Sequence, residues 1–547
     1  MDMLLMYWLP CLCMIAGMVM AARRLTHYFQ LESYQFHGYF QTVNRQWRRA
    51  IAPYLALSGI YLGIFLLSLF LAVILWMSDD HASWTAPQVI WVLLCCAGYV
   101  LAGWFIRKWG MKRSEKKKFA LTARMKRLYG ALIVTLLLIP ALVSLIWGDV
   151  HILGALCCVI AALLLPWLVA LAGLLALPVE RLIFRLYFKD AEKKLMENPK
   201  LIRIGITGSY GKTSTKFILA EILGQKYNVL ATPASFNTPM GVTRIIRERL
   251  TPAHQVFIGE MGARHVGEIR ELSGLVHPQI GVLTAVGPQH LDTFKTLERI
   301  KNTKYELIDA LPGDGLGVFL HDGDIVTGLY EKTQKPKMLV GREGSDAWAT
   351  DESVSPAGSR FTLHLKGWEP FDCETQLLGE HNIRNILTAS AVAKYLGLSR
   401  EQIRRGIQSC KPVEHRLQLL KTPGGVTVID DAFNTNPRSS KEALKVLSSF
   451  PGRRVIVTPG MVELGAQEEK YNEEFGQAMA EAVDVAVLVG RKHTEPIYRG
   501  LKDQGFDESS IHAVASLNEA IAVVNGLLRP GDVVMYENDL PDNYSES

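Results

Sequence analysis

Hydrophobic residues are concentrated in the first third of the chain, where they form long stretches. These cover residues 4–21, 53–77, 89–106, 128–147 and 152–177. Each is close to the ~20 residues that an α-helix needs to cross the hydrocarbon core of a bilayer. The pattern predicts an α-helical membrane domain over residues 1–190, with about five spans. Pro166 could instead split the last stretch into a re-entrant pair, which leaves five against six spans open.

Basic residues alternate between the loops that join these stretches. Lys and Arg are abundant after the first, third and fifth stretches, whereas residues 78–88 and 148–151 contain none. Since cytoplasmic loops carry the excess of Lys and Arg, we expect a multi-pass protein of the plasma membrane. Its N-terminus would lie outside, and everything after about Pro178 would lie in the cytoplasm.

From residue 201 the pattern changes to short β-rich runs that alternate with amphipathic helical segments. Strands are expected at 201–206, 256–258 and 280–284, a helix at 213–224, and a β-rich insertion around 332–372. A second series begins after residue 412, with strands near 426–429, 454–458, 483–489 and 532–536. This rhythm is typical of α/β folds with parallel sheets. It predicts an ATP-binding domain over 195–410 and a Rossmann-like domain over 411–547.

Composition agrees with a chain of two parts. Hydrophobic residues make up 49% of the 547 residues, and the mean hydropathy is +0.14, but the excess lies in the first third. The net charge of +6 is also localised, mainly in a basic run at 107–127. That run is flanked by apolar stretches and holds few aromatic residues, so we interpret it as a membrane loop and expect no nucleic-acid partner. The eight cysteines form no CxxC pair, which favours a reducing compartment without a zinc site.

One motif between a predicted strand and a helix carries most of the chemical information. It contains, in order, Gly208, Ser209, Tyr210, Gly211, Lys212, Thr213 and Ser214. Glycines let the backbone wrap a phosphate, and the helix N-terminus adds a positive field. Lys212 would reach the outer phosphates of ATP, and the Thr213 hydroxyl would bind Mg²⁺. Ile206 stands where the longer phosphate-loop pattern has its first glycine, so the loop is of the short T-G-x-x-G-K-T form.

Several polar residues further along are ambiguous when each is taken alone. Lys304 alone fits an ordinary surface lysine on a helix, and His290 fits a histidine of a loop or core. Asn382 and Asn385 could cap a helix. Their joint order together with the phosphate loop makes a functional interpretation stronger than these separate ones.

Taken together, these motifs resemble the Mur ligase family over about residues 200–535. The matching segments are Gly208–Thr213, Glu260, His290, Lys304, residues 379–385, residues 415–417 and residues 430–437. Residues 430–437, 460–465 and 235–242 are most similar to the MurF type, which adds D-alanyl-D-alanine to a UDP-muramoyl tripeptide. The resemblance implies an ATP-dependent amide ligase of cell-wall precursor synthesis that acts through an acyl phosphate.

The resemblance also assigns roles to residues. Lys212, Lys304, His290 and Arg416 would be catalytic, and Thr213, Glu260, His290 and a carbamylated Lys304 would bind two Mg²⁺ ions. ATP would further contact Asn382, Asn385, Arg416 and Asp431. The substrates would contact Asn237, Thr238, Asn434 and Asn436.

Two features depart from the family. Membrane stretches occupy the place of the usual UDP-binding domain, and residues 536–544 differ from the Lys-Gly-Ser that MurF enzymes carry near their end. The carboxylate acceptor and the amine donor could therefore be small molecules or lipid-linked, and the membrane lipids themselves are expected partners. The oligomeric state is not predicted. A polymerising ligase of the poly-γ-glutamate kind, or a non-catalytic ATP-binding scaffold, are the alternatives. A transporter is disfavoured, because the predicted spans lack ionisable pathway residues.

Overall fold

A computed structural model describes residues 3–76, 86–109, 118–147, 151–422, 424–433 and 435–539. The chain separates into two compact units, Met1–Ile183 and Phe184–Ser547, each with hydrophobic cores of its own. Parts of three loops on which the predicted topology rests, as well as the predicted substrate residue Asn434 and the tail 540–547, lie outside the described residues.

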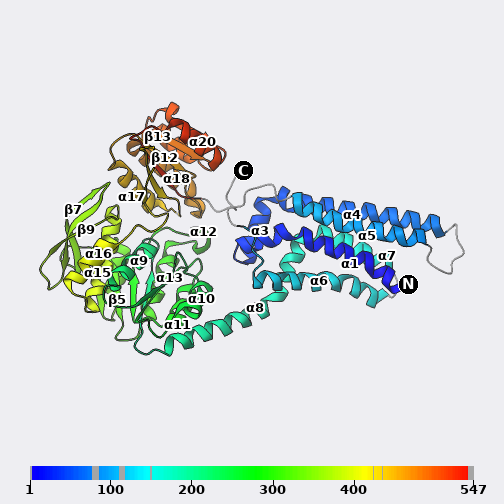
Figure 1. Cartoon of the computed structure of the whole chain (residues 1–547), viewed down its shortest axis with the longest axis horizontal. Helices are drawn as coiled ribbons and strands as arrows, with labels where there is room; N and C mark the ends of the chain where they lie inside the picture. Colours follow the sequence, from blue (N-terminus) through cyan, green and yellow to red (C-terminus); the bar gives the residue numbers. More distant parts are fainter. Residues whose placement is uncertain are drawn as a thin grey trace. The chain divides into compact units, whose positions relative to one another are not determined.

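The first unit is entirely helical over its described residues, and its helices run lengthwise alongside one another (Figure 1). Helix α1 packs along α5, α4 packs along α5 and α7, and α6 packs along α7. The helices are α1 (Met3–Ala21), α2 (Arg23–Leu31), α3 (Phe36–Arg45), α4 (Trp47–Trp76), α5 (Ala86–Trp109), α6 (Ala123–Trp147), α7 (His151–Leu163) and α8 (Leu165–Met196), of which α8 continues into the second unit.

Five helical stretches among the described residues are long and apolar enough to cross a membrane. They are Trp8–Leu31, Trp47–Leu71, Val89–Trp109, Ala123–Ile146 and Leu165–Met196. The expected number of five is therefore found. Helix α1 ends at Ala21, where the first stretch was predicted to end, and the separate helix α2 continues to Leu31. The predicted span 152–177 was wrong as a single helix, because it divides into α7 and the start of α8.

The break in that last stretch has a local cause. Helix α7 ends at Leu163 and α8 begins at Leu165, directly before Pro166. Proline has no amide hydrogen to donate to the preceding turn, so the first turn of a helix accommodates it at lower cost than the interior does. The buried Tyr39 hydroxyl donates to the carbonyl of Pro166 at 2.7 Å, which satisfies an acceptor near the break.

The second unit contains a nine-stranded sheet in the order β2-β3-β1-β4-β5-β6-β7-β8-β9. Strands β1 to β7 run parallel, and β8 is antiparallel to both of its neighbours, β7 and β9. The β-rich insertion predicted around 332–372 is thus confirmed. The strands are β1 (Ile202–Thr207), β2 (Val229–Ala231), β3 (Val256–Glu260), β4 (Ile280–Leu283), β5 (Leu316–Leu320), β6 (Lys337–Val340), β7 (Ala347–Ser355), β8 (Gly358–Leu365) and β9 (Phe371–Thr375).

Helices cover both faces of this sheet because its central strands are apolar on both sides. Ile204 and Ile258 point into a core shared with one helical layer, whereas Phe257 points into the core on the opposite face. The first layer consists of α9 (Lys212–Leu223), α15 (Glu380–Tyr395) and α16 (Arg400–Ser409). The second consists of α10 (Pro239–Arg249), α11 (Glu268–Val276), α13 (Leu297–Asp309) and α14 (Asp324–Lys332), with the end of α8.

A six-stranded sheet follows in the order β10-β11-β15-β12-β13-β14, with only β10 antiparallel. Its strands are β10 (Gln418–Lys421), β11 (Thr427–Asp431), β12 (Arg454–Thr458), β13 (Val485–Val489), β14 (Ile511–Val514) and β15 (Val533–Glu537). One face is covered by α17 (Pro437–Ser448), α18 (Glu468–Ala482) and α19 (Glu495–Asp503), and the other by α20 (Leu517–Leu527). The predicted α/β class with two parallel sheets is confirmed.

The closest helix packing in the first unit leads to a stability prediction. A Cβ added at Gly103 of α5 would lie 2.2 Å from the backbone oxygen of Gly17 of α1, so the two helices would have to separate. We expect Gly103→Ala to destabilise the protein by about 1–3 kcal/mol. Its thermal unfolding temperature in detergent would fall correspondingly.

Gly59 of α4 is the matched control, since a Cβ there meets no heavy atom within 4 Å. Gly59→Ala should leave the unfolding temperature unchanged or raise it, because alanine favours a helix over glycine by up to about 1 kcal/mol. Equal shifts for the two variants would contradict the close packing of α1 on α5.

Candidate active site

The phosphate loop lies at the carboxyl end of β1. Gly211 caps α9 with a φ of 76°, and a Cβ there would lie 2.8 Å from Asn385 Oδ1, so this position requires glycine. The Ser209 amide donates to the Ala285 carbonyl at 2.7 Å, and the Tyr210 hydroxyl donates to the Pro288 carbonyl at 3.1 Å. The loop is therefore held against the segment that follows β4.

Glu260 is the centre of the polar contacts beside this loop. It ends β3, directly opposite Ile206 of β1, and is only 1% exposed. Its Oε1 accepts hydrogen bonds from the Thr213 hydroxyl at 3.1 Å and from Asn237 Nδ2 at 3.0 Å, and its Oε2 accepts from Lys216 Nζ at 2.8 Å. The hydroxyl and carboxylate oxygens of Thr213 and Glu260 are ligands of the kind that Mg²⁺ prefers, so the residues present fit this ion.

Four cationic or titratable groups gather around the same point. Burial lowers the pKa of Lys212 to about 8, while Glu260 raises it and Arg416 lowers it further. Burial, with Lys212 nearby, also holds the pKa of Lys304 well below its usual range, although Glu260 opposes this. His290 faces Lys304, and burial lowers the pKa of this imidazole and of the Arg416 guanidinium. A polyanion such as the triphosphate of ATP suits a site in which cations are this poorly hydrated.

A chain of side-chain contacts ties helix α15 to helix α9. The Thr215 hydroxyl donates to Asn385 Oδ1 at 3.1 Å, and Asn385 Nδ2 donates to Asn382 Oδ1 at 3.3 Å. Asn382 in turn donates to the Leu378 carbonyl at 2.9 Å, and both asparagines are buried. The predicted nucleotide-contacting residues thus lie behind the phosphate loop and position it.

Two carboxyl groups lie side by side on the six-stranded sheet, the half-buried Asp431 and the buried Glu537. Asp431 and Glu537 end the neighbouring parallel strands β11 and β15 in register. Burial raises the pKa of each to about 7, and Glu537 raises the pKa of Asp431 further. Thr458 donates to Glu537 Oε2 at 2.6 Å, whereas Oε1 has no hydrogen-bond partner among the residues that the structure describes. Arg416 lowers the pKa of Asp431, so these two residues, both expected to contact ATP, lie close enough to interact.

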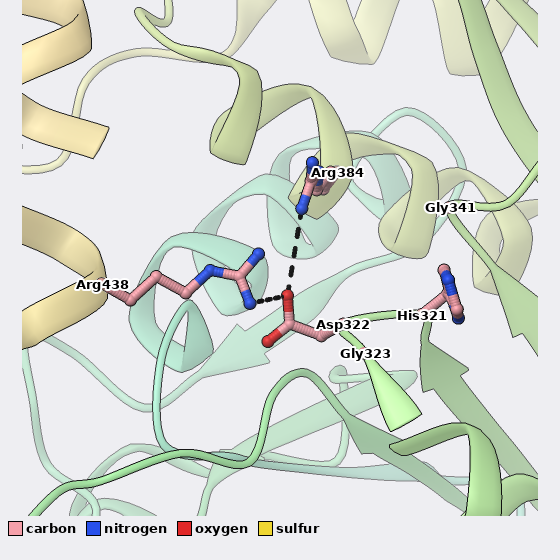
Figure 2. Close-up of a pocket in the computed structure, with 6 residues that line it drawn as sticks. All are labelled: His321, Asp322, Gly323, Gly341, Arg384 and Arg438. Carbon is pink, nitrogen blue, oxygen red and sulfur yellow. Dashed lines mark ion pairs between the residues drawn. The ribbon is translucent and has the colours of Figure 1, made fainter. Parts of the chain in front are cut away.

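A polar pocket of about 380 Å³ opens where the carboxyl ends of β5 and β6 meet helices α15 and α17. Figure 2 shows Arg384 of α15 and Arg438 of α17 converging on the nearly buried Asp322. Burial raises the pKa of Asp322, and Arg438 lowers it. Helix α15 covers the nine-stranded sheet and α17 covers the six-stranded sheet. The ion pair between Asp322 and Arg438 therefore joins the parts of the chain built on these two sheets.

The predicted substrate residues have different surroundings. Asn237 contacts Glu260 as described, whereas the Thr238 side chain caps α10 by accepting from the Gly241 amide at 3.3 Å. The Asn436 side chain caps α17 by accepting from the Arg438 and Ser439 amides. Ser214 is half-buried in the first turn of α9. The substrate role of Asn237, Thr238 and Asn436 stays a prediction.

Sequence reasoning missed several residues that the fold brings to this site. Lys216 could have been found, because it lies one helical turn after Lys212 on the same helix. The others come from distant segments, and only Glu463 lies in a segment, 460–465, that carried the resemblance. They are Arg264, Asp322, Arg438, Glu463 and Glu537.

Family comparisons match both α/β parts of the chain. The family model of the Mur ligase middle domain matches residues 206–393. The model of the Mur ligase glutamate ligase domain matches residues 415–536, and the two matches together cover more than half of the chain. The chain belongs to the Mur ligase family. Its two α/β parts are called the middle and C-terminal domains below.

Relatives with curated names agree with the MurF type. The UDP-N-acetylmuramoyl-tripeptide–D-alanyl-D-alanine ligase of Mycobacterium bovis is 36% identical over 356 residues, which cover 61% of this chain and 69% of the relative. The ligase of the same name from Bacillus subtilis is 29% identical over 337 residues, covering 61% and 72%. The predicted resemblance to MurF-type ligases is confirmed.

Solved structures lead to the same conclusion. MurF from Acinetobacter baumannii superposes with a TM-score of 0.61 at 27% identity, over 66% of this chain and 79% of that one. MurF from Thermotoga maritima in complex with ADP superposes with a TM-score of 0.59 at 25% identity, over 66% and 82%. This Mur ligase is an ATP-dependent enzyme that forms C–N bonds, and the scaffold and polymerase alternatives are not favoured.

The carboxyl pair of the C-terminal domain leads to a pH prediction. Between about pH 4.5 and 7, folded Glu537 keeps a proton that the unfolded chain releases, so stability falls as pH rises through this window and levels off above it. Gln has no such proton to lose. We expect Glu537→Gln to exceed the wild type in stability by on the order of 3 kcal/mol near pH 8, and by far less near pH 5.

The measurement is the thermal unfolding of both proteins across this pH range. Glu469→Gln, an exposed change on α18, is the control and should follow the wild-type curve. Parallel curves for Glu537→Gln and wild type would show that Glu537 is ionised in the folded protein.

Proposed function

We propose that this Mur ligase joins an amine, in the first instance D-alanyl-D-alanine, to the carboxylate of a muramoyl tripeptide at the expense of ATP. The observation that carries the proposal is the convergence of Lys212, Thr213, Glu260, His290 and Lys304 in a chain similar to MurF ligases. The substrates in this proposal are inferred from the names of these relatives.

The cations of the site suit the first chemical step. The substrate carboxylate attacks the γ-phosphorus of ATP, so that an acyl phosphate forms and ADP leaves. Lys212 and Arg416 would neutralise the charge that develops on the phosphoryl oxygens, and the phosphate-loop amides would orient them. Mg²⁺, held by Thr213 and Glu260, would add further charge neutralisation. The amine then attacks the acyl carbon, and phosphate leaves as the amide forms.

Lys304 is suited to carbamylation. It is 2% exposed, and its low pKa favours the neutral amine, which is the form that reacts with CO₂. A carbamate would turn a buried cation into an anion beside His290, able to bind a second Mg²⁺. Among the described residues no three His, Cys, Asp or Glu side chains form a ready metal cluster, so oxygens from a carbamate and from ATP would complete the coordination.

The helical unit would hold the enzyme at the cytoplasmic face of the plasma membrane, with the N-terminus outside. Large apolar side chains are exposed on its helices, including Leu94, Phe105 and Leu145. Such a surface is unfavourable in water and suits lipid. The division into domains 1–190, 195–410 and 411–547 is part of this proposal, and the family matches at 206–393 and 415–536 support it.

We also infer that the carboxylate substrate can be lipid-linked. The two family matches cover residues 206–393 and 415–536, both of which follow the helical unit in sequence. A substrate that is itself anchored in the bilayer would be concentrated near such an enzyme. UDP-linked and lipid-linked muramoyl tripeptides are therefore the two acceptors to compare.

The first test measures phosphate release by the full chain in lipid nanodiscs with ATP and Mg²⁺. UDP-linked or lipid-linked muramoyl tripeptide is offered with D-alanyl-D-alanine, each substrate also being omitted in turn. We expect release only when both an acid and an amine are present, and none from Lys212→Ala, because the loop would lose its phosphate-binding cation.

Release with the UDP-linked acceptor alone would overturn the lipid-linked part of the proposal and leave the ligase. Release that depends on neither substrate, or tight ATP binding without any release, would contradict the ligase itself.

A second test addresses Lys304. We expect mass spectrometry of the native protein in bicarbonate to show one added CO₂, which Lys304→Ala lacks. The same variant should release phosphate at least ~100-fold more slowly, since a metal ligand would be lost. Lys301→Ala, at a half-buried lysine one helical turn away that pairs with Glu298, is the control and should behave like the wild type. An unmodified Lys304 in an active enzyme would refute the carbamate.

A further inference from the structure

Glu463 of the C-terminal domain reaches into the middle domain and contacts a residue of the proposed metal site. Its Oε2 lies 2.5 Å from His290 Nδ1, and its Oε1 lies 3.3 Å from a guanidinium nitrogen of Arg264. The residue follows β12 in the segment 460–465 and has a φ of 64°, which is rare for a residue other than glycine. A side chain aimed across the domain boundary from this backbone conformation points to a role beyond its own domain.

The segment that carries Glu463 is firmly attached to the C-terminal domain. Asn472 of α18 accepts from the Met461 amide at 2.8 Å and donates to the Met461 carbonyl at 2.9 Å. The Leu464 amide donates to Glu468 at 3.4 Å. Because both sides of Glu463 are tied to α18, the position of its carboxylate follows the position of the whole domain.

The contact with His290 selects one form of the imidazole. A carboxylate only accepts hydrogen bonds, so Nδ1 must carry the hydrogen. The lone pair is then on Nε2, which is the nitrogen left for a metal ion. Histidines that bind metals commonly donate their other N–H to a carboxylate in this way, which fixes both the tautomer and the ring orientation.

The backbone of His290 is held by the start of a short helix, but its ring depends on Glu463. His290 has a φ of 51° and precedes the short helix α12 (Leu291–Phe294). The only side-chain hydrogen bond of its ring among the described residues is the one to Glu463. Lys304, the other proposed ligand of the second metal, approaches from α13 and contributes charge but no such hydrogen bond.

We propose that Glu463 is a positioning residue that prepares His290 for the metal when the C-terminal domain docks on the middle domain. The proposal rests on the assignment of His290 to the metal site made under the proposed function. It makes metal binding depend on domain closure, since the carboxylate that sets the tautomer and the histidine that binds the ion belong to different domains.

The ion pair between Asp322 and Arg438 provides an internal comparison. It also joins the two domains, but it lies at the ends of β5 and α17 and does not contact His290. A residue that only holds the domains together should therefore behave like Arg438. A residue that prepares His290 should differ from it in the properties of the metal site.

The experiment compares Glu463→Ala, Glu463→Gln and Arg438→Gln in the full chain, with exposed Glu469→Gln of α18 as the matched surface control. Phosphate release is measured as a function of ATP and of Mg²⁺. We expect Glu463→Ala to lower kcat or the apparent Mg²⁺ affinity by about 10–100-fold, the usual effect of losing a carboxylate behind a metal-binding histidine. The KM for ATP should change little, because the phosphate loop is intact.

Glu463→Gln should retain part of the activity, since its amide oxygen can still accept from Nδ1–H although the charge is lost. Arg438→Gln should raise the KM for ATP without changing the Mg²⁺ dependence, and Glu469→Gln should match the wild type. If Glu463→Ala and Arg438→Gln gave the same pattern, with an unchanged Mg²⁺ dependence, Glu463 would be a docking contact and the proposal would be overturned.

A second readout needs neither metal nor substrates. In ¹⁵N-histidine-labelled protein, the His290 signals, assigned by their loss in His290→Asn, report which ring nitrogen carries the hydrogen. We expect the Nδ1–H form in the wild type and a shift toward Nε2–H in Glu463→Ala. An Nε2–H form in the wild type would overturn the proposal. Because this measurement does not require turnover, it can support or refute the Glu463 contact even if no substrate pair of the proposed function releases phosphate.

Discussion

Glu260 carries a carboxylate in a place that water does not reach, and much of the site follows from how that charge is accommodated. An ionised group without water needs hydrogen-bond donors and an opposite charge. Thr213 and Lys216 supply them from one helix, and Asn237 supplies another from the loop before α10. The carboxylate thereby ties the phosphate-loop helix, the end of β3 and the loop before α10 into one unit. In the proposed function, its Oε1, which accepts from Thr213, is also a ligand of Mg²⁺.

The surroundings of this unit are arranged for a polyanion. Lys212 and Arg416 lie close enough to repel each other, and burial lowers the pKa of each. Bringing like charges together in a poorly hydrated site is unfavourable until a negative ligand neutralises them. A ligase whose first step transfers a phosphoryl group needs this preorganisation more than it needs an acid or a base.

The two units of the chain are stabilised in different ways because their surroundings differ. In the α/β unit, apolar side chains on both faces of each sheet are covered by helices, as Phe257 and Ile258 illustrate. In the helical unit, many large apolar side chains stay exposed, and the helices approach through small residues such as Gly17 and Gly103. Close packing through small residues is how helices associate where hydrophobic burial offers little gain.

Local chemistry explains why so much was predictable from the sequence alone. The phosphate loop, the strands around it and the helix at α9 depend on short-range rules for glycine, β-branched residues and helix starts, so Gly208–Thr213 could be placed from the residues themselves. The count of five long apolar helices was equally accessible, because it depends on length and composition. The break between α7 and α8 at Leu164 was only partly predictable from the sequence. Pro166 indicated a possible break, but the hydrogen bond from Tyr39 to Pro166 comes from a helix far away in the chain.

Contacts between distant segments could not be predicted in this way. Nothing near Glu463 in the chain indicates that it meets His290, 173 positions away, or that Asp322 lies between arginines of two different helices. The sequence by itself determined which residue types were present for ATP chemistry and in what order. Only the tertiary structure decided which of them share a buried site, because long-range packing sets the burial, the hydrogen-bond partners and hence the charge of each group.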